Sequence, residues 1–151
     1  VLQMVEPDQK CVIIAADTTV VSPRGTILNK PESESDAARM LGQLQGQTHT
    51  VYTAYTILAE ADSGKQKSLT RVIATRVTMR PLKKAEILAY IQTGEPMDKA
   101  GAYGAQSIGM GLIAKIQGSY TNVVGLPVAE LMNDLETKFA VTGSVTAKWN
   151  R

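Results

Sequence analysis

The sequence predicts one α/β domain built on a mixed, twisted sheet with flanking helices. Two observations lead to this fold class: β-branched apolar runs recur along the chain, and three stretches between them repeat apolar residues at helical spacing. The chain has 151 residues, of which 44% are apolar and 20% are charged, a balance that suits one compact core. We therefore expect a single domain over residues 1–151.

The first predicted strand is the apolar run VIIAA at positions 12–16, which ends at Asp17. A short, continuously apolar run is typical of a buried strand in a parallel sheet. Asp17 would then lie at the carboxyl end of that strand, the edge of an open α/β sheet where ligands bind. The residues at 22–25, SPRG, predict a turn directly after it.

The remaining elements follow from periodicity. Positions 51–58 and 69–79 are rich in β-branched residues and are separated by the polar residues DSG at 62–64, which predicts a long antiparallel hairpin. Positions 112–116 predict another strand, and the polar segment 142–151 is expected to be a loosely held tail. Three helices are expected, with the apolar faces Ala37, Met40, Leu41 and Leu44; Ala85, Ile87, Leu88 and Ile91; and Val128, Leu131, Met132 and Leu135.

Composition excludes several kinds of function. With one His and one Cys, a single chain cannot assemble a zinc site of three or four nitrogen and sulfur ligands, nor an intrachain disulfide, and a reducing cytoplasm fits. No signal peptide or apolar run long enough to span a membrane is visible. The net charge is +2 and the longest basic cluster is Lys83-Lys84, so neither nucleic acid nor a membrane is an expected partner.

Carboxylates, lysines and glycine-rich backbone remain as candidates for chemistry, at Asp17, Lys30 and the loop 98–104. These groups are what phosphate chemistry with a hard divalent metal requires. Each also has a structural interpretation: Asp17 as a turn cap, Lys30 as a solvated charge before a helix, and the loop as a connection that faces solvent. His49, in the polar segment GQTH, is expected to be structural rather than a catalytic base. Pattern alone leaves these alternatives open.

Five segments, in order, resemble signatures of the Maf (septum-formation-protein-like) family of nucleoside-triphosphate pyrophosphatases. The resemblance covers about 11–135. The segments are ADTTVV at 16–21, NKP at 29–31, GQTHTVYT at 46–53, GEPMDKAGAYGAQ at 94–106 and NVVGLP at 122–127.

The resemblance implies a fold like that of inosine-triphosphate pyrophosphatases, a homodimer, and a reaction that needs Mg²⁺ or Mn²⁺. Family members cleave the α–β phosphate linkage of a nucleoside triphosphate and release the monophosphate and pyrophosphate. Asp17 would be the catalytic proton acceptor and a metal contact. The loop resembles that of the branch acting on dTTP and UTP. The substrate-binding residues implied are Thr18, Lys30, Asp98, Lys99 and Gln106.

Two departures from the family pattern bear on activity. Ser107 replaces the Gly that usually follows Gln106, and the first ten residues do not match the family's opening strand, its Ser-x-x-Arg-Arg element or its first helix. We therefore expect a chain truncated at its N-terminal end. The leading hypothesis is a dTTP/UTP pyrophosphatase; the second is a catalytically silent Maf-like module that acts through dimerisation or partner binding in division control.

Overall fold

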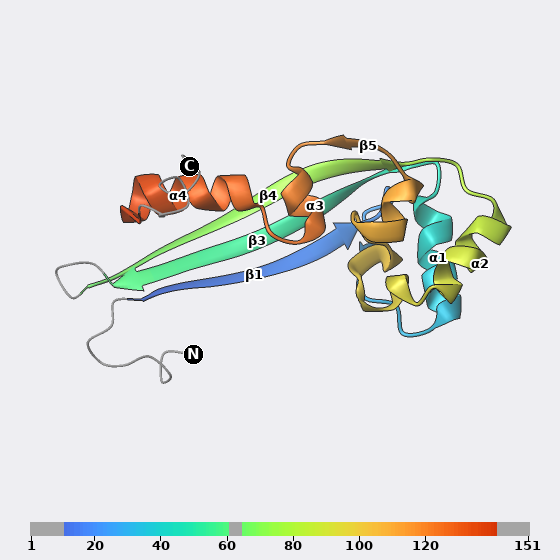
Figure 1. Cartoon of the computed structure of the whole chain (residues 1–151), viewed down its shortest axis with the longest axis horizontal. Helices are drawn as coiled ribbons and strands as arrows, with labels where there is room; N and C mark the ends of the chain where they lie inside the picture. The colour runs from blue at the N-terminus through green and yellow to red at the C-terminus, as the bar shows by residue number, and fades with distance from the viewer. Residues whose placement is uncertain (1–10, 61–64, 142–151) are drawn as a thin grey trace, which may run out of the picture.

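The computed structural model describes residues 11–60 and 65–141. Its centre is a five-stranded sheet in the order β2-β1-β3-β4-β5, in which each neighbouring pair is antiparallel. The strands are β1 (Val12–Val21), β2 (Ile27–Leu28), β3 (Thr48–Glu60), β4 (Gln66–Met79) and β5 (Ile113–Gln117). The long strands β1, β3 and β4 run the length of the molecule as a twisted ribbon (Figure 1). The α/β fold class with flanking helices is confirmed.

The first strand differs from its prediction in three ways. β1 extends to Val21 instead of stopping before Asp17, it pairs antiparallel with β3, and most of its first half is exposed. The strand continues because the residues that follow Asp17 are Thr18, Thr19, Val20 and Val21, all β-branched and well suited to extended backbone. Apolar content alone could not reveal the partner of this strand, because pairing depends on the distant segment 50–59.

The predicted hairpin is confirmed and is longer than expected: β3 and β4 pair from Thr48↔Thr78 to Glu60↔Gln66. The predicted turn at 62–64 and the tail at 142–151 lie outside the described residues. Alternation is clean on β3, where the odd-numbered positions from His49 to Ile57 are buried. On the other face Tyr52 is 39% exposed, and Val72 of β4, which pairs with Ala54, is 62% exposed.

All three predicted helices form, as α1 (Glu34–Leu44), α2 (Lys84–Gln92) and α4 (Val128–Phe139). Ser33 caps α1 by accepting the Asp36 N–H at 3.1 Å, and Gly46 follows the helix with a left-handed φ of 64°. A short α3 (Tyr120–Val124) precedes α4, and the 3-10 turns η2 (Glu95–Asp98), η3 (Ala100–Ala102) and η4 (Ser107–Leu112) connect α2 to β5. These small elements and β2 were not predicted.

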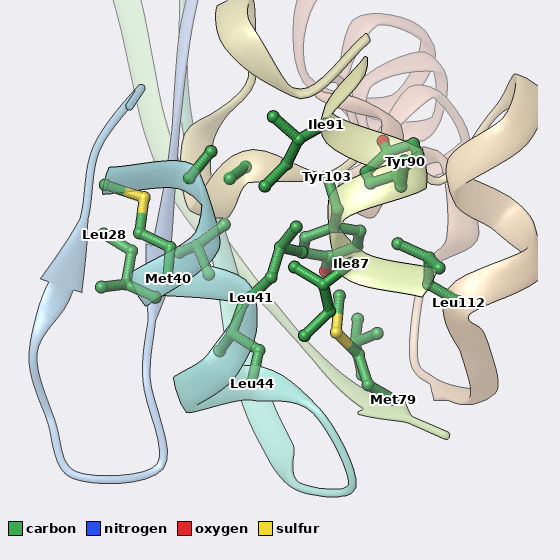
Figure 2. Close-up of a cluster of buried hydrophobic side chains, with 14 of the residues drawn as sticks. Leu28, Met40, Leu41, Leu44, Met79, Ile87, Tyr90, Ile91, Tyr103 and Leu112 are labelled. Atoms are coloured by element: carbon green, nitrogen blue, oxygen red, sulfur yellow. The ribbon is translucent and has the colours of Figure 1, made fainter. Parts of the chain in front are cut away.

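The main core lies at the end of the ribbon where α1 and α2 gather (Figure 1). Figure 2 shows side chains from β2, α1, α2 and β4 meeting there, among them Leu28, Leu41, Ile87 and Met79. The ring of Tyr103 packs into the same core from the segment after η3. This packing fixes the position of the 98–106 loop relative to the sheet.

A second, smaller core lies at the other end of the ribbon, under α4. Its buried members are Tyr55, Ile57, Leu131 and Leu135. The predicted apolar face of α4 is therefore only half correct, since Val128 and Met132 are 43% and 41% exposed.

Candidate functional site

A cavity of about 350 Å³ opens where β1, the 98–106 loop and α3 meet. Its lining contains all six residues that the sequence singled out, although they come from three separate segments of the chain. They are Asp17, Thr18, Lys30, Asp98, Lys99 and Gln106. The remaining lining is mostly apolar or glycine, and includes Val20, Val51, Tyr103, Val123 and Gly125.

Asp17 lies in the middle of β1, opposite Ala54 of β3, and not at the end of the strand. Its side chain therefore projects on the same open face of the sheet as Ala54. Among residues 11–60 and 65–141 its carboxylate has no ion-pair or hydrogen-bond partner, and it is exposed. There is no turn at this position for Asp17 to cap, so the turn-cap interpretation is wrong.

Thr18 points to the opposite face and connects β1 to α3. Its hydroxyl donates to the Gly125 carbonyl at 3.1 Å and lies 2.9 Å from the hydroxyl of Thr53. Asn122 lies behind them, fully buried, and its side-chain amide donates to the Val51 carbonyl at 3.1 Å. Sequence reasoning assigned Asn122 no role, although it opens the NVVGLP segment. Together these bonds fix α3 against the sheet and form the floor of the cavity.

Lys30, Asp98 and Lys99 form the charged side of the cavity. Lys99 Nζ donates to the Asp98 carboxylate at 2.7 Å, and the Asp98 side chain is 76% exposed. The hydrogen bond from Lys99 and its charge, with a contribution from Lys30, hold the pKa of Asp98 below its usual value. With Asp17 included, the four charged lining residues comprise two cations and two anions, which sum to zero.

Gly101 holds the loop close to the sheet. Its N–H donates to the Asn29 carbonyl at 3.1 Å, directly beside Lys30, and its φ of 73° is left-handed. A Cβ at this position would lie only 2.9 Å from the side chain of Val20. Glycine is therefore required here by both conformation and space. This contact brings Lys30 and the Asp98-Lys99 pair to the same side of the cavity.

His49 does not line the cavity. It is buried behind the wall, where its Nε2 lies 2.7 Å from the hydroxyl of Tyr103 and the two rings meet edge to face. Burial lowers the pKa of His49 to about 4, so the ring is neutral at physiological pH. Tyr103 itself lines the cavity. The contact of His49 with the site is therefore indirect, as expected of a structural histidine.

The donor set of the cavity fits a hard divalent cation held jointly with a substrate. Within the described residues no group of three or more His, Cys, Asp or Glu side chains could hold a metal ion. Asp17 and Asp98 are nevertheless the two acidic residues among those that line the cavity. Mg²⁺ typically takes one or two carboxylates and completes its shell with phosphate oxygens and water.

Comparison with known proteins decides the family. A family model described as Maf-like protein matches residues 1–138. The chain belongs to the Maf-like protein family. Three curated relatives named dTTP/UTP pyrophosphatase show the degree of similarity: a Geobacter metallireducens protein is 47% identical over 128 residues, a Carboxydothermus hydrogenoformans protein 50% over 124, and a Neisseria meningitidis serogroup B protein 47% over 124.

These alignments cover 85%, 82% and 82% of this chain but 65%, 64% and 58% of the respective relatives. The chain thus spans less than two thirds of the length of each of these three Maf-like relatives. In the described part of the chain, no helix has the length and apolar character needed to cross a membrane.

Proposed function

We propose that this Maf-like chain forms the nucleotide site of a pyrophosphatase that hydrolyses dTTP and UTP to the monophosphate and pyrophosphate. The observation that carries the proposal is the cavity, whose lining brings together two lysines, an exposed amide and Asp17, an acidic residue with no partner among residues 11–60 and 65–141. The names of the relatives support the choice of nucleotides.

The charged side of the cavity suits the triphosphate. Lys30 and Lys99 present ammonium groups that would bind phosphate oxygens, and charge-assisted contacts of this kind are the strong ones. Because the lining charges sum to zero, binding of a polyanion would gain from further cations. A bound Mg²⁺ or Mn²⁺, contacted by Asp17 and Asp98, would neutralise part of the phosphate charge.

The reaction itself is a displacement by water at the α-phosphorus. The water oxygen bonds to that phosphorus, the bond to the oxygen that bridges to the β-phosphate breaks, and pyrophosphate leaves. Asp17 would accept the proton that the water releases, since its carboxylate is free of other partners in the described chain. At the other end of the cavity, the exposed amide of Gln106 would recognise the base, and Thr18 would hold the floor against which the base lies.

Hydrolysis in ¹⁸O-labelled water tests the proposal. The protein, expressed from its complete reading frame, is incubated with each nucleoside triphosphate and Mg²⁺, and the products are resolved by phosphorus NMR. We expect dTTP and UTP to react fastest, with the label in the monophosphate. A label in pyrophosphate would contradict attack at the α-phosphorus, and absence of any hydrolysis would contradict the enzyme function.

A matched pair of lysine variants locates the site. Lys30→Met removes a cation from the cavity, whereas Lys67→Met removes one from the hairpin end, where Lys67 Nζ lies over the ring of Phe139. Loss of a charge-assisted contact of about 1.5–3 kcal/mol should raise KM roughly tenfold or more in Lys30→Met. Lys67→Met should leave KM unchanged, and equal effects would contradict the assignment of the cavity.

The open sheet face favours a second candidate, a catalytically silent partner-binding module. Tyr52 and Val72 are large apolar side chains that are 39% and 62% exposed on neighbouring strands. Surfaces of this kind often bind other proteins. This candidate predicts no pyrophosphate release by the wild-type protein in the labelled-water experiment.

A further inference from the structure

A carboxylate outside the cavity organises the loop that carries Gln106. Glu95, at the start of η2, accepts the N–H of Gly109 at 2.9 Å and that of Ile108 at 3.1 Å. It also accepts the hydroxyl of Tyr90, from α2, at 3.1 Å. Neither Glu95 nor these three donors line the cavity. Three donors on one carboxylate are more than a solvated surface glutamate would collect.

Tyr90 and Glu95 together also hold the N-terminal end of this loop, at Gly104. The Tyr90 hydroxyl, besides donating to Glu95, accepts the N–H of Gly104 at 3.2 Å. Gly104 and Gly109 are therefore tied to one Tyr90–Glu95 pair, and they also touch each other. A Cβ on Gly109 would lie 2.4 Å from the Gly104 carbonyl oxygen and 2.6 Å from the Tyr90 hydroxyl. Residues 105–108 thus form a loop with closed ends, and Gln106 lies inside it.

A third anchor reaches the loop from α3. The hydroxyl of Tyr120 donates to the Ala105 carbonyl at 3.1 Å, one residue before Gln106. The Tyr120 side chain is 47% exposed, so its ring contributes little to the core. Its hydrogen bond instead connects the loop to α3, whose Val123 and Val124 line the cavity.

The loop needs anchors because its backbone is strained. Ser107, directly after Gln106, has a left-handed φ of 53°, a conformation that is unfavourable for a residue with a side chain. Burial alone would raise the pKa of Glu95, but hydrogen bonds from Gly109, Tyr90 and Ile108 outweigh it and lower that pKa. Glu95 is therefore ionised at neutral pH, and its bonds are charge-assisted.

We propose that Glu95, Tyr90 and Tyr120 are positioning residues that fix the side-chain amide of Gln106 for recognition of the nucleotide base. The inference rests on the proposed function, because it needs a base to be recognised in the cavity. None of the three touches the substrate site, so each acts through the backbone on either side of Gln106.

Two variants with matched controls test the inference. Glu95→Gln turns one acceptor oxygen into a donor that opposes the incoming N–H groups, and Tyr120→Phe removes a single hydrogen bond from an exposed side chain. The controls are Asp134→Asn and Tyr55→Phe, which weaken the corresponding carboxylate–tyrosine pair in the second core, where Tyr55 donates to Asp134 at 2.5 Å. Each control removes the same chemical group far from Gln106.

The readout is the ratio of kcat/KM for UTP to that for CTP, two bases that differ in donor and acceptor pattern. We expect this ratio to fall roughly tenfold in Glu95→Gln and severalfold in Tyr120→Phe. It should stay unchanged in both controls, because destabilisation reduces the active fraction equally for every substrate. An unchanged ratio in Glu95→Gln and Tyr120→Phe would overturn the inference.

Hydrogen exchange separates failure of this inference from failure of the proposed function. In the protein without nucleotide, peptides that cover 103–112 should exchange about tenfold faster in Glu95→Gln than in wild type and unchanged in Asp134→Asn. Unaltered exchange in Glu95→Gln would also overturn the inference that Glu95 holds the loop around Gln106. If the wild-type protein hydrolyses no nucleotide, the proposed function fails instead, and with it the role of Glu95, Tyr90 and Tyr120 in recognition of the base.

Discussion

Each end of the ribbon contains a carboxylate that accepts a hydrogen bond from a tyrosine hydroxyl, but the two pairs have different roles. At the helical end Glu95 accepts a hydroxyl from Tyr90, and at the hairpin end Asp134 accepts a hydroxyl from Tyr55. The further partners of Glu95 are backbone N–H groups of a loop beside the cavity, whereas Asp134 accepts from the side chain of Arg71. The first pair therefore shapes a loop, and the second attaches a helix to the sheet.

The cores beneath these pairs also differ in size. Among the described residues the main core contains fifteen buried side chains, against four in the core under α4. The cavity borders the larger one, through Val20, Val51 and Tyr103. A site that must hold several segments in register needs a rigid foundation, and dense packing provides it. The candidate site and the larger core therefore lie together at the helical end.

Substitution of Asp17 should give the largest effect on kcat, and comparison with a substitution at the hairpin end should show that activity depends on the helical end. Asp17→Asn keeps the size of the side chain but removes its basicity, so kcat should fall about 10²–10⁴-fold. The unfolding midpoint should hardly change, because Asp17 is exposed and has no partner in the described chain. Asp134→Asn should show the reverse, with normal kcat and a lower midpoint. Pyrophosphate release and thermal unfolding measure both, and an active but destabilised Asp17→Asn would remove Asp17 from catalysis.

Leucine truncation compares the cores directly. Leu41 is fully buried in the main core, and Leu131 is 4% exposed in the core under α4. Leu41→Ala should cost about 3–5 kcal/mol in free energy of unfolding, because its crowded neighbours cannot close the cavity. Leu131→Ala should cost about 2 kcal/mol, since a helix packed on one sheet face can shift inward. Urea unfolding tests this order, and equal losses would show that both cores are equally rigid.

Mild acid should weaken the helical end first. The pKa of His49 is lowered to about 4 by burial, so between pH 6.5 and 4 the unfolded chain binds a proton that the folded chain does not. Folding stability is complete above pH 6.5 and falls with pH, by about 3 kcal/mol at pH 4. His49→Gln should remove most of the slope above pH 5, because carboxyl groups with lowered pKa values, such as Glu95 and Asp98, lose their contribution only at lower pH. Urea unfolding at several pH values measures it, and a slope above pH 5 that persists in His49→Gln would point to another group.

The smallest effects are expected from two residues with left-handed backbone, one in each region. Ser107 has a φ of 53° and Ala140, after α4, a φ of 54°. Glycine relieves this strain but adds entropy to the unfolded chain, so Ser107→Gly and Ala140→Gly should each stabilise by no more than about 1 kcal/mol. Only Ser107→Gly should alter the UTP-to-CTP ratio. A change of that ratio in Ala140→Gly would contradict the division between the two ends.

Local patterns in the sequence predicted that the hairpin and the three helices form, but only for α1 did they predict the whole buried face. The spacing of Ala37, Met40, Leu41 and Leu44 predicted α1, and all four side chains are buried. Strand pairing was predicted poorly, because β1 has the composition of a buried parallel strand but pairs antiparallel and is largely exposed. The partner of a strand is set by tertiary contacts that its own residues do not encode.

The cavity was anticipated through the family resemblance more than through physical patterns. Resemblance placed Thr18 and Gln106 beside Asp17, and the structure gathers all three at one cavity; their chemical roles remain predictions. Glu95 and Asn122 escaped notice because a glutamate before Pro96 and an asparagine in a turn look like ordinary polar residues. Their roles depend on hydrogen bonds to residues distant in the sequence, and these bonds are visible only in the structure.

The uninterrupted ladder between β3 and β4 restricts how the gene for this protein can change in length. Side chains alternate between faces along the ladder, with Tyr55 and Ile57 buried and Tyr52 and Ala54 exposed. Deletion of one codon within β3 would turn every later side chain to the opposite face, so that Ile57 would meet solvent. Deletions of two codons would preserve the alternation. Length variation inside this strand should therefore accumulate in pairs of residues.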